Sequence, residues 1–159
     1  MKKNIDEIIK NSVKKTFCDM AFIDTAAFDG KKDIVFSHIL SIDILKPFFG
    51  KIALFLPFEC KNKIAENIYG KNFKELKSQE IDDCQLELLN ILVGNILSGY
   101  FGSKKKCKVD LPSIIFDKDE IEWNKKNIDE YYFDAEGSVF KLVFQSSGLH
   151  FSRQSGDKK

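Results

Sequence analysis

The chain has 159 residues, enough for one compact domain, and its content of 43% hydrophobic and 13% aromatic residues excludes general disorder. The 25 basic residues are balanced by 24 acidic ones, which leaves a net charge of only +1. Binding to nucleic acid or to a membrane surface needs a clear excess of basic charge, so we expect neither partner. Arg153 is also the only arginine, which removes most bidentate recognition of phosphates or guanines.

The sequence shows no signal region, no membrane-spanning segment and no paired cysteines, and these absences indicate the compartment. Asp6, Glu7 and Lys10 interrupt any apolar signal region near the start of the sequence. The longest apolar run, residues 52–58, is far below the roughly 20 residues that span a bilayer. The four cysteines are scattered and form no C-x-x-C pair, which favours free thiols over a zinc or redox site. We therefore expect a soluble cytoplasmic protein with no metal site of its own.

The first half of the chain predicts a helix, two strands and a second helix. Apolar residues at helical spacing indicate a helix over residues 5–20. Alternating apolar and polar residues indicate a half-buried strand over 36–44, and the more apolar segment 51–56 indicates a partner strand that is buried more deeply. A helix over about 60–69 follows, and Gly70 suits its C-cap. Three residues of this helix are expected to face the core: Ile64, Ile68 and Tyr69.

The second half begins with the longest helical pattern, over about residues 81–101, and then turns to strands. The strand-like segments are 107–111, about 128–133 and 139–144. Asp134-Ala135-Glu136-Gly137, between the last two, is typical of a hairpin turn. We place one domain over residues 1–145 and a frayed polar tail over 146–159. Together the elements predict an α+β fold, a mostly antiparallel sheet with about three helices, two of them packed on one face.

The usual catalytic signatures are absent from the sequence. His38 and His150 are the only histidines, and neither belongs to a Ser-His-Asp order or a nucleophile elbow. His38 alternates with apolar strand residues, which favours a packed histidine over a base. The acidic run 117–120 lacks the central glycine of a calcium loop and indicates a solvated loop. The lysines at 104–106 and 108 indicate a turn after the long helix, and could touch a phosphate.

One polar stripe on the long helix stands apart from this background. Spacings of 4, 3, 4 and 4 residues align five residues on one face: Asp83, Glu87, Asn90, Gly94 and Ser98. Between Leu86 and Phe101 the other residues are apolar apart from Asn95 and Gly99. Four residues are expected on the buried side of the helix: Leu86, Leu89, Val93 and Leu97. A glycine at position 94 costs roughly 1 kcal/mol relative to alanine, but it clears room for another surface beside the Asn90 amide. An ordinary exposed stripe gives the same pattern, since E-x-x-N occurs by chance in many helices.

The segment Asp83-Cys84-Gln85-Leu86-Glu87-Leu88-Leu89-Asn90, followed by the small residue Gly94, resembles the motif of the CheX branch of the CheC/CheX/FliY family of bacterial chemotaxis phosphatases. That motif is an acidic residue or serine, three residues, glutamate, two residues and asparagine. The order of elements is similar from about residue 4 to 145, and the single E-x-x-N is typical of CheX, since CheC proteins carry two. Leu88 and Leu89 depart from the pattern, because family members often have smaller residues there.

The resemblance implies a phosphatase that hydrolyses the aspartyl phosphate of a phosphorylated CheY-like response regulator. Asn90 would orient the attacking water, and Glu87 would contact the receiver's active-site lysine. Asp83, Gly94 and Ser98 would bind the partner. No cofactor of its own is implied, because the carboxylates of the response regulator would hold the Mg²⁺. The family also implies a homodimer formed by strand pairing. Two alternatives stay open: a non-catalytic response-regulator docking or flagellar-switch module, and an unrelated α+β enzyme with a small-molecule site.

Overall fold

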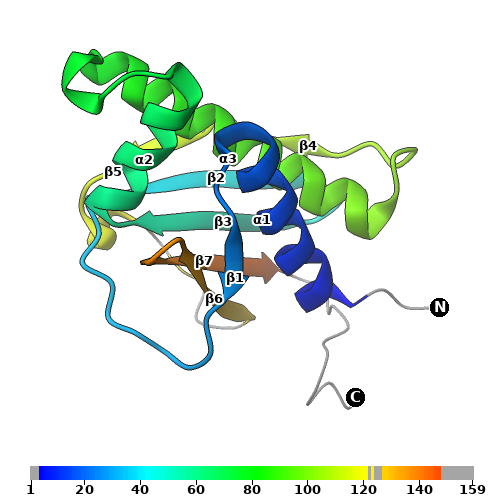
Figure 1. The fold of residues 1–159 in the computed structure, drawn as a ribbon. Coiled ribbons are helices and arrows are strands. Elements are labelled where there is room, and N and C mark those ends of the chain that lie inside the picture. Colours follow the sequence, from blue (N-terminus) through cyan, green and yellow to red (C-terminus); the bar gives the residue numbers. More distant parts are fainter. Residues whose placement is uncertain (1–3, 122, 124–126, 148–159) are drawn as a thin grey trace.

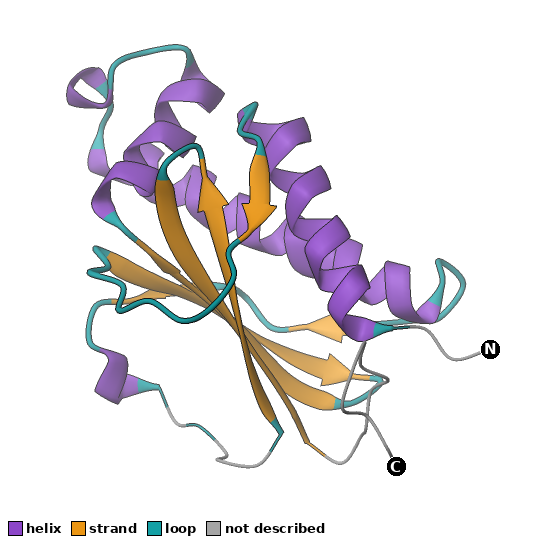
Figure 2. Cartoon of the chain, turned by 60° about the horizontal axis from the view of Figure 1, so that its bottom comes forward, coloured by secondary structure: helices purple, strands orange, loops and turns teal. Residues whose placement is uncertain are grey.

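The structure is a computed structural model that describes residues 4–121, 123 and 127–147. In this part of the chain, three helices lie over one face of a single seven-stranded sheet (Figure 1, Figure 2). The helices are α1 (Ile5–Ala21), α2 (Phe58–Tyr69) and α3 (Ser78–Phe101), with two short 3-10 helices, η1 (Phe73–Glu75) and η2 (Lys118–Glu120). The strands are β1 (Thr25–Ala27), β2 (His38–Lys46), β3 (Phe49–Leu56), β4 (Lys108–Val109), β5 (Ser113–Ile115), β6 (Ile128–Ala135) and β7 (Ser138–Ser147). The predicted α+β class is confirmed, with all three helices on the same face.

The sheet is antiparallel throughout, in the order β1-β6-β7-β3-β2-β4, and β5 also pairs with β2. The hairpin between β6 and β7 turns at Glu136 and Gly137, whose φ angles of 54° and 101° are both positive. Positive φ at both central residues is the geometry of the tight two-residue turns that join antiparallel strands, and glycine adopts it readily. The predicted hairpin is therefore confirmed.

Several predicted boundaries differ from the structure. Strand β7 continues to Ser147, which pairs with Phe49, so residues 146 and 147 belong to the sheet and not to the tail. The rest of the predicted tail, 148–159, lies outside the described residues. Tyr69 does not face the core: it is 38% exposed, and its hydroxyl donates to the Glu80 carbonyl at 3.2 Å, because a phenol at a helix end finds a polar partner there.

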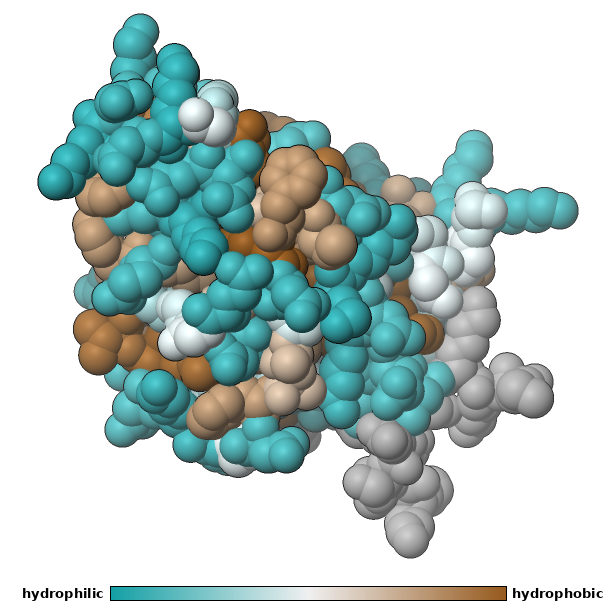
Figure 3. All heavy atoms as spheres, in the orientation of Figure 1, coloured by the Kyte–Doolittle hydropathy of each residue, from teal (hydrophilic) through white to brown (hydrophobic). Residues whose placement is uncertain are grey.

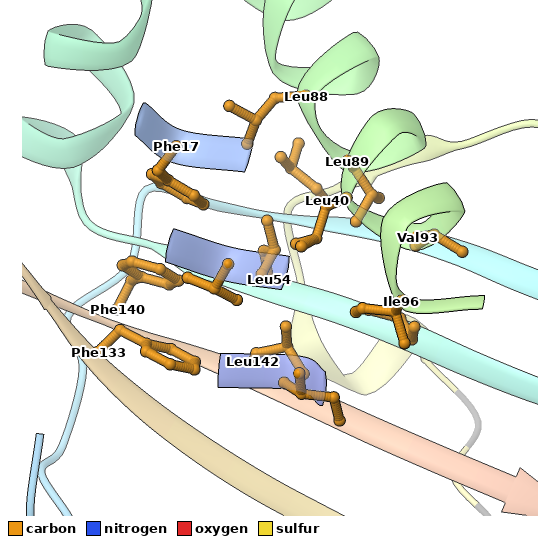
Figure 4. Packing of buried hydrophobic residues seen from close by; sticks show 14 of the residues in the cluster. Phe17, Leu40, Leu54, Leu88, Leu89, Val93, Ile96, Phe133, Phe140 and Leu142 are labelled. Carbon is orange, nitrogen blue, oxygen red and sulfur yellow. The ribbon is translucent and has the colours of Figure 1, made fainter. Parts of the chain in front are cut away.

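The main core lies between the sheet and the three helices (Figure 4). Phe17 of α1 stacks on Phe140 of β7, with ring centroids 4.9 Å apart. Leu89 and Val93 of α3 point toward the same layer and are fully buried. One side of α3 packs in this core, and the opposite side is exposed to solvent. Within the described residues, no helix is both long and apolar enough to cross a membrane.

Candidate functional site

The five residues of the polar stripe lie together on the exposed face of α3, as the spacing predicts. All of them are exposed: Asp83, Glu87, Asn90, Gly94 and Ser98. The side chains of Glu87 and Asn90 form no hydrogen bond or ion pair with any other described residue. Their polar atoms are therefore available to water or to a partner. Ser98 differs, because its hydroxyl donates to the Gly94 carbonyl at 2.8 Å and so is used within the helix.

The opposite side of α3 confirms three of the four predicted core positions. Leu89 and Val93 are fully buried and Leu97 is 4% exposed. Leu86 packs against the core but is only partly buried, so it lies at the edge of the predicted buried side. The reason is helical geometry: Leu86 lies one turn before Asn90, at the flank of the exposed stripe. Leu88, one of the two departures from the family pattern, is fully buried like Leu89, so both large residues fill core space.

Polar contacts to the other two helices fix the rotation of α3 about its axis. The Asn95 side chain donates to the Thr16 hydroxyl of α1 at 2.8 Å, and Thr16 is 1% exposed. The Gln85 amide donates to the Lys61 carbonyl of α2 at 2.8 Å. A rotation of α3 would leave these buried groups unpaired, at a cost of about 1–3 kcal/mol each. The exposed direction of the Glu87 and Asn90 side chains is thereby specified.

The two glycines of α3 have different surroundings. A Cβ added at Gly94 would meet nothing within 4 Å, so the surface beside Asn90 is open. A Cβ added at Gly99 would lie 3.0 Å from Cγ2 of Ile8, so that glycine allows α1 to approach. No contact within the described residues requires a glycine at position 94. Its position agrees with the expectation that another surface comes close to the helix there.

A groove of about 350 Å³ begins at the C-terminal half of the stripe. One wall comes from α3, and the other comes from the segment that leads into β4. The α3 wall is formed by Asn90, Gly94, Leu97 and Ser98, and the opposite wall includes Ser103, Lys105 and Cys107. The structure thus brings three predicted site residues, Asn90, Gly94 and Ser98, to one concave surface. Asp83 and Glu87 lie on the same face of α3 but outside this groove.

The ends of this surface carry opposite charges. The acidic side chains before Asn90 are Glu80, Asp82, Asp83 and Glu87, all at least partly exposed. The lysines after the helix, at positions 104–106 and 108, are all exposed. Asn90 is the neutral polar residue between the two groups. Such a surface suits a partner that presents both a cation and an anion.

The other candidate residues are structural. Burial, and then the charge of Lys61, lower the pKa of His38 to about 4, and its ring packs edge-on against Phe116. This confirms the predicted packed histidine. The cysteines are free thiols as predicted, and burial raises the pKa of Cys60 to about 12. The acidic run 117–120, which forms η2 and its N-cap, is exposed as predicted. Among the described residues, no group of three or more side chains is placed to hold a metal ion.

A larger pocket of about 550 Å³ lies between residues 32–35, the start of α2 and the β6–β7 hairpin. Lys63 and Glu136 in its lining form an ion pair at 2.9 Å. The raised pKa of Cys60 keeps that thiol protonated near neutral pH, where it is a poor nucleophile. The one thiol in this pocket is therefore not activated for nucleophilic attack. The pocket by itself gives no support to an unrelated enzyme with a small-molecule site.

The fold is that of the CheC/CheX class of chemotaxis proteins. The family model described as chemotaxis phosphatase CheX matches residues 39–134, and the chain belongs to this family. No curated protein matches the chain by sequence. A CheX crystal structure from Desulfovibrio desulfuricans is similar, with a TM-score of 0.74 and 15% identity over 90% of this chain and 99% of that chain.

Two further solved structures share the fold. The CheX–CheY–BeF₃–Mg²⁺ complex from Borrelia burgdorferi contains a similar chain, with a TM-score of 0.71 and 14% identity over 90% of this chain and 97% of that one. FliY from Thermotoga maritima is similar at a TM-score of 0.55 and 18% identity, over 91% of this chain and 87% of that one. At these identities the likeness concerns the fold.

Proposed function

We propose that this protein is a phosphatase that hydrolyses the aspartyl phosphate of a CheY-like response regulator. One observation carries the proposal. Glu87 and Asn90 are exposed one turn apart, without partners among the described residues, on a helix whose opposite side packs in the core. The chain also belongs to the CheX family, and a similar chain has been crystallised with CheY and BeF₃.

Asn90 is the catalytic residue of this proposal. An acyl phosphate is already activated, so catalysis mainly requires a water molecule placed in line with phosphorus. A neutral amide suits this task, because it both donates to and accepts from a water and does not titrate. The amide of Asn90 has no partner among the described residues, and the open space beside Gly94 lets the phosphorylated aspartate approach it.

Glu87 gives the helix its position on the partner. Its carboxylate is exposed, and one turn separates it from Asn90. An ion pair between Glu87 and the receiver's active-site lysine would hold Asn90 over the phosphoryl group. The Mg²⁺ of the reaction belongs to the response regulator, whose own carboxylates would hold it. The proposal assigns this chain no metal, and it assigns Asp83, Gly94 and Ser98 to the surface that the receiver covers.

The test is the decay of a phosphorylated CheY-like receiver with and without this protein. The proposal predicts faster release of inorganic phosphate in the presence of catalytic amounts of the protein. A receiver that binds the protein but loses its phosphate at the unassisted rate would instead support the second candidate, a docking or flagellar-switch module. The shared fold of Thermotoga maritima FliY is the observation that favours this second candidate.

The homodimer stays a prediction. The strands that end the sheet or lie along the outer side of β2 are short, three residues in β1, two in β4 and three in β5. Among the described residues, strand pairing between two subunits could begin at one of these short strands or along residues 128–131 of β6, which β1 does not cover. Light scattering coupled to gel filtration would give twice the mass of 18.3 kDa for the dimer and that mass for a monomer.

A further inference from the structure

The segment 103–108, which we call the lysine loop, is the densest positive charge in the sequence. It contains Lys104, Lys105, Lys106 and Lys108, in a chain with a net charge of +1. All six residues are exposed. None of the four ammonium groups forms an ion pair with a described residue. In Figure 1 the loop projects from the edge of the molecule between α3 and β4, and hydrophilic atoms project there in Figure 3.

The loop shares a concave surface with the catalytic residue of the proposed function. Lys105 lines one wall of the 350 Å³ groove whose other wall includes Asn90. A partner that reaches Asn90 along this groove is therefore brought beside the lysine loop. The flexible four-carbon stems of the neighbouring lysines extend the reach of the loop beyond the groove itself.

The charges on either side of Asn90 also fit one orientation of the partner. Glu87 precedes Asn90 on α3, and the lysine loop follows at the end of the helix. A phosphorylated receiver site presents a lysine, a phosphoryl group and the carboxylates that hold Mg²⁺. If Glu87 contacts the lysine of the receiver, the lysine loop faces the part of the receiver beside the phosphoryl group. The loop binds there only if that part of the receiver surface is negatively charged. Opposite charges at the two ends then disfavour the reversed orientation.

We propose that the lysine loop binds the anionic surface beside the phosphorylated aspartate of the receiver and thereby fixes the direction in which the receiver lies on α3. This inference rests on the proposed function and extends it to a second contact region. The loop does not touch the reacting atoms, so it is a positioning element and not a catalytic one. Its contribution lies in affinity and association rate, while the turnover of bound receiver depends on Asn90.

A pair of matched variants tests this inference. Lys104→Gln with Lys105→Gln removes two charges from the loop, and Lys31→Gln with Lys32→Gln removes two from an exposed loop near the larger pocket. The measurement is the Kd for a receiver activated with BeF₃⁻ and Mg²⁺, at about 0.05 M and about 0.5 M salt. We expect the first pair to weaken binding by about 2–30-fold at low salt and by much less at high salt. The Lys31/Lys32 pair should bind as the wild type does.

A charge-preserving variant and the melting temperatures distinguish receiver binding by the lysine loop from a purely structural role of its lysines. Lys104→Arg with Lys105→Arg keeps the charge and should restore binding. Cations beyond the end of α3 also stabilise the helix dipole, so the melting temperature of each variant is measured as well. A lower melting temperature with unchanged Kd would overturn the inference and leave the lysines a structural role.

The inference and the proposed function fail in different ways. If the wild type accelerates phosphate release and both glutamine pairs bind alike, the inference is wrong and the function stands. If the wild type binds in a lysine-dependent manner without accelerating release, the inference stands and the phosphatase proposal is wrong. If no CheY-like receiver of the same organism binds, both are wrong.

Discussion

Nδ2 of Asn95 donates to Oγ1 of Thr16 at 2.8 Å, and this contact joins α3 to α1 at a buried position. Asn95 lies five residues after Asn90, on a different side of α3, so Asn95 holds the helix to α1 while Asn90 is exposed without a partner among the described residues. The contact thus specifies which face of α3 is exposed.

We expect Asn95→Ala to lower the free energy of unfolding by about 1–3 kcal/mol, because the buried Thr16 hydroxyl loses its partner. The double variant Asn95→Leu with Thr16→Val removes both polar groups and should recover part of the loss. Denaturant unfolding measures both. Equal stability of Asn95→Ala and the wild type would mean that this hydrogen bond does not hold the two helices.

The two glycines of α3 give a matched pair of alanine variants. Gly94→Ala should stabilise the protein by up to about 1 kcal/mol, because alanine favours helix and a Cβ there meets nothing within 4 Å. The same change should slow dephosphorylation of the receiver, since the added methyl group occupies the surface that the partner approaches.

Gly99→Ala is the control for that pair. Its Cβ would lie 3.0 Å from Ile8, so we expect little or no gain in stability and unchanged activity. Melting temperature and phosphate release are compared across both variants. Full activity in Gly94→Ala would contradict a close approach of the partner at position 94.

The orientation of α3 can be tested by comparing how much two leucine-to-alanine variants lower the free energy of unfolding. Leu89 is fully buried, and Leu89→Ala should cost about 2–5 kcal/mol of unfolding free energy. Leu86 is partly buried at the flank of the stripe, so Leu86→Ala should cost clearly less. Urea unfolding of the two variants gives the order. The reverse order would show that α3 is rotated relative to this structure.

His38 should make stability depend on pH. Burial and the nearby Lys61 charge lower its pKa to about 4 in the folded state, against about 6.5 in an unfolded chain. The unfolded state therefore binds more protons between these values, and stability falls as the pH drops from 6.5 to 4. The loss attributable to His38 should approach about 3 kcal/mol. His38→Leu should flatten this part of the profile, and two parallel profiles would contradict the assignment.

Much of the fold follows from local patterns in the sequence. The period of 3.6 residues in α1 and α3 is long enough to show. The alternation in β2 predicts the strand but not its burial: the predicted half-buried strand is wrong, because His38 and Ser41 are buried along with their apolar neighbours, on a strand that is covered on both faces. Strands β1 and β5 have three residues each, too few for a period of two to appear, and tertiary pairing with β6 and β2 forms them. Tyr69 fits an inward helical pattern, but its hydroxyl bonds to the Glu80 carbonyl instead.

The site could be predicted because its residues lie on one helix. Spacing alone aligns Asp83, Glu87 and Asn90, and the structure exposes all three. The groove could not be predicted, because its second wall comes from the lysine loop, whose position against α3 depends on the path of the chain into β4. The Asn95–Thr16 contact also joins residues far apart in the sequence, and no local pattern indicates it.

In the proposed function, Asn90 orients the water that attacks the phosphoryl group. The most direct test is single-turnover decay of the phosphorylated receiver with wild type, Asn90→Ala and Glu87→Ala, with the Kd for the BeF₃⁻-activated receiver measured for each. Both are exposed positions, where substitution changes stability by less than about 0.5 kcal/mol, so the fold should persist. We predict that Asn90→Ala binds normally but turns over about a hundredfold more slowly or worse, while Glu87→Ala is also impaired in binding. Wild-type turnover by Asn90→Ala would contradict the catalytic account.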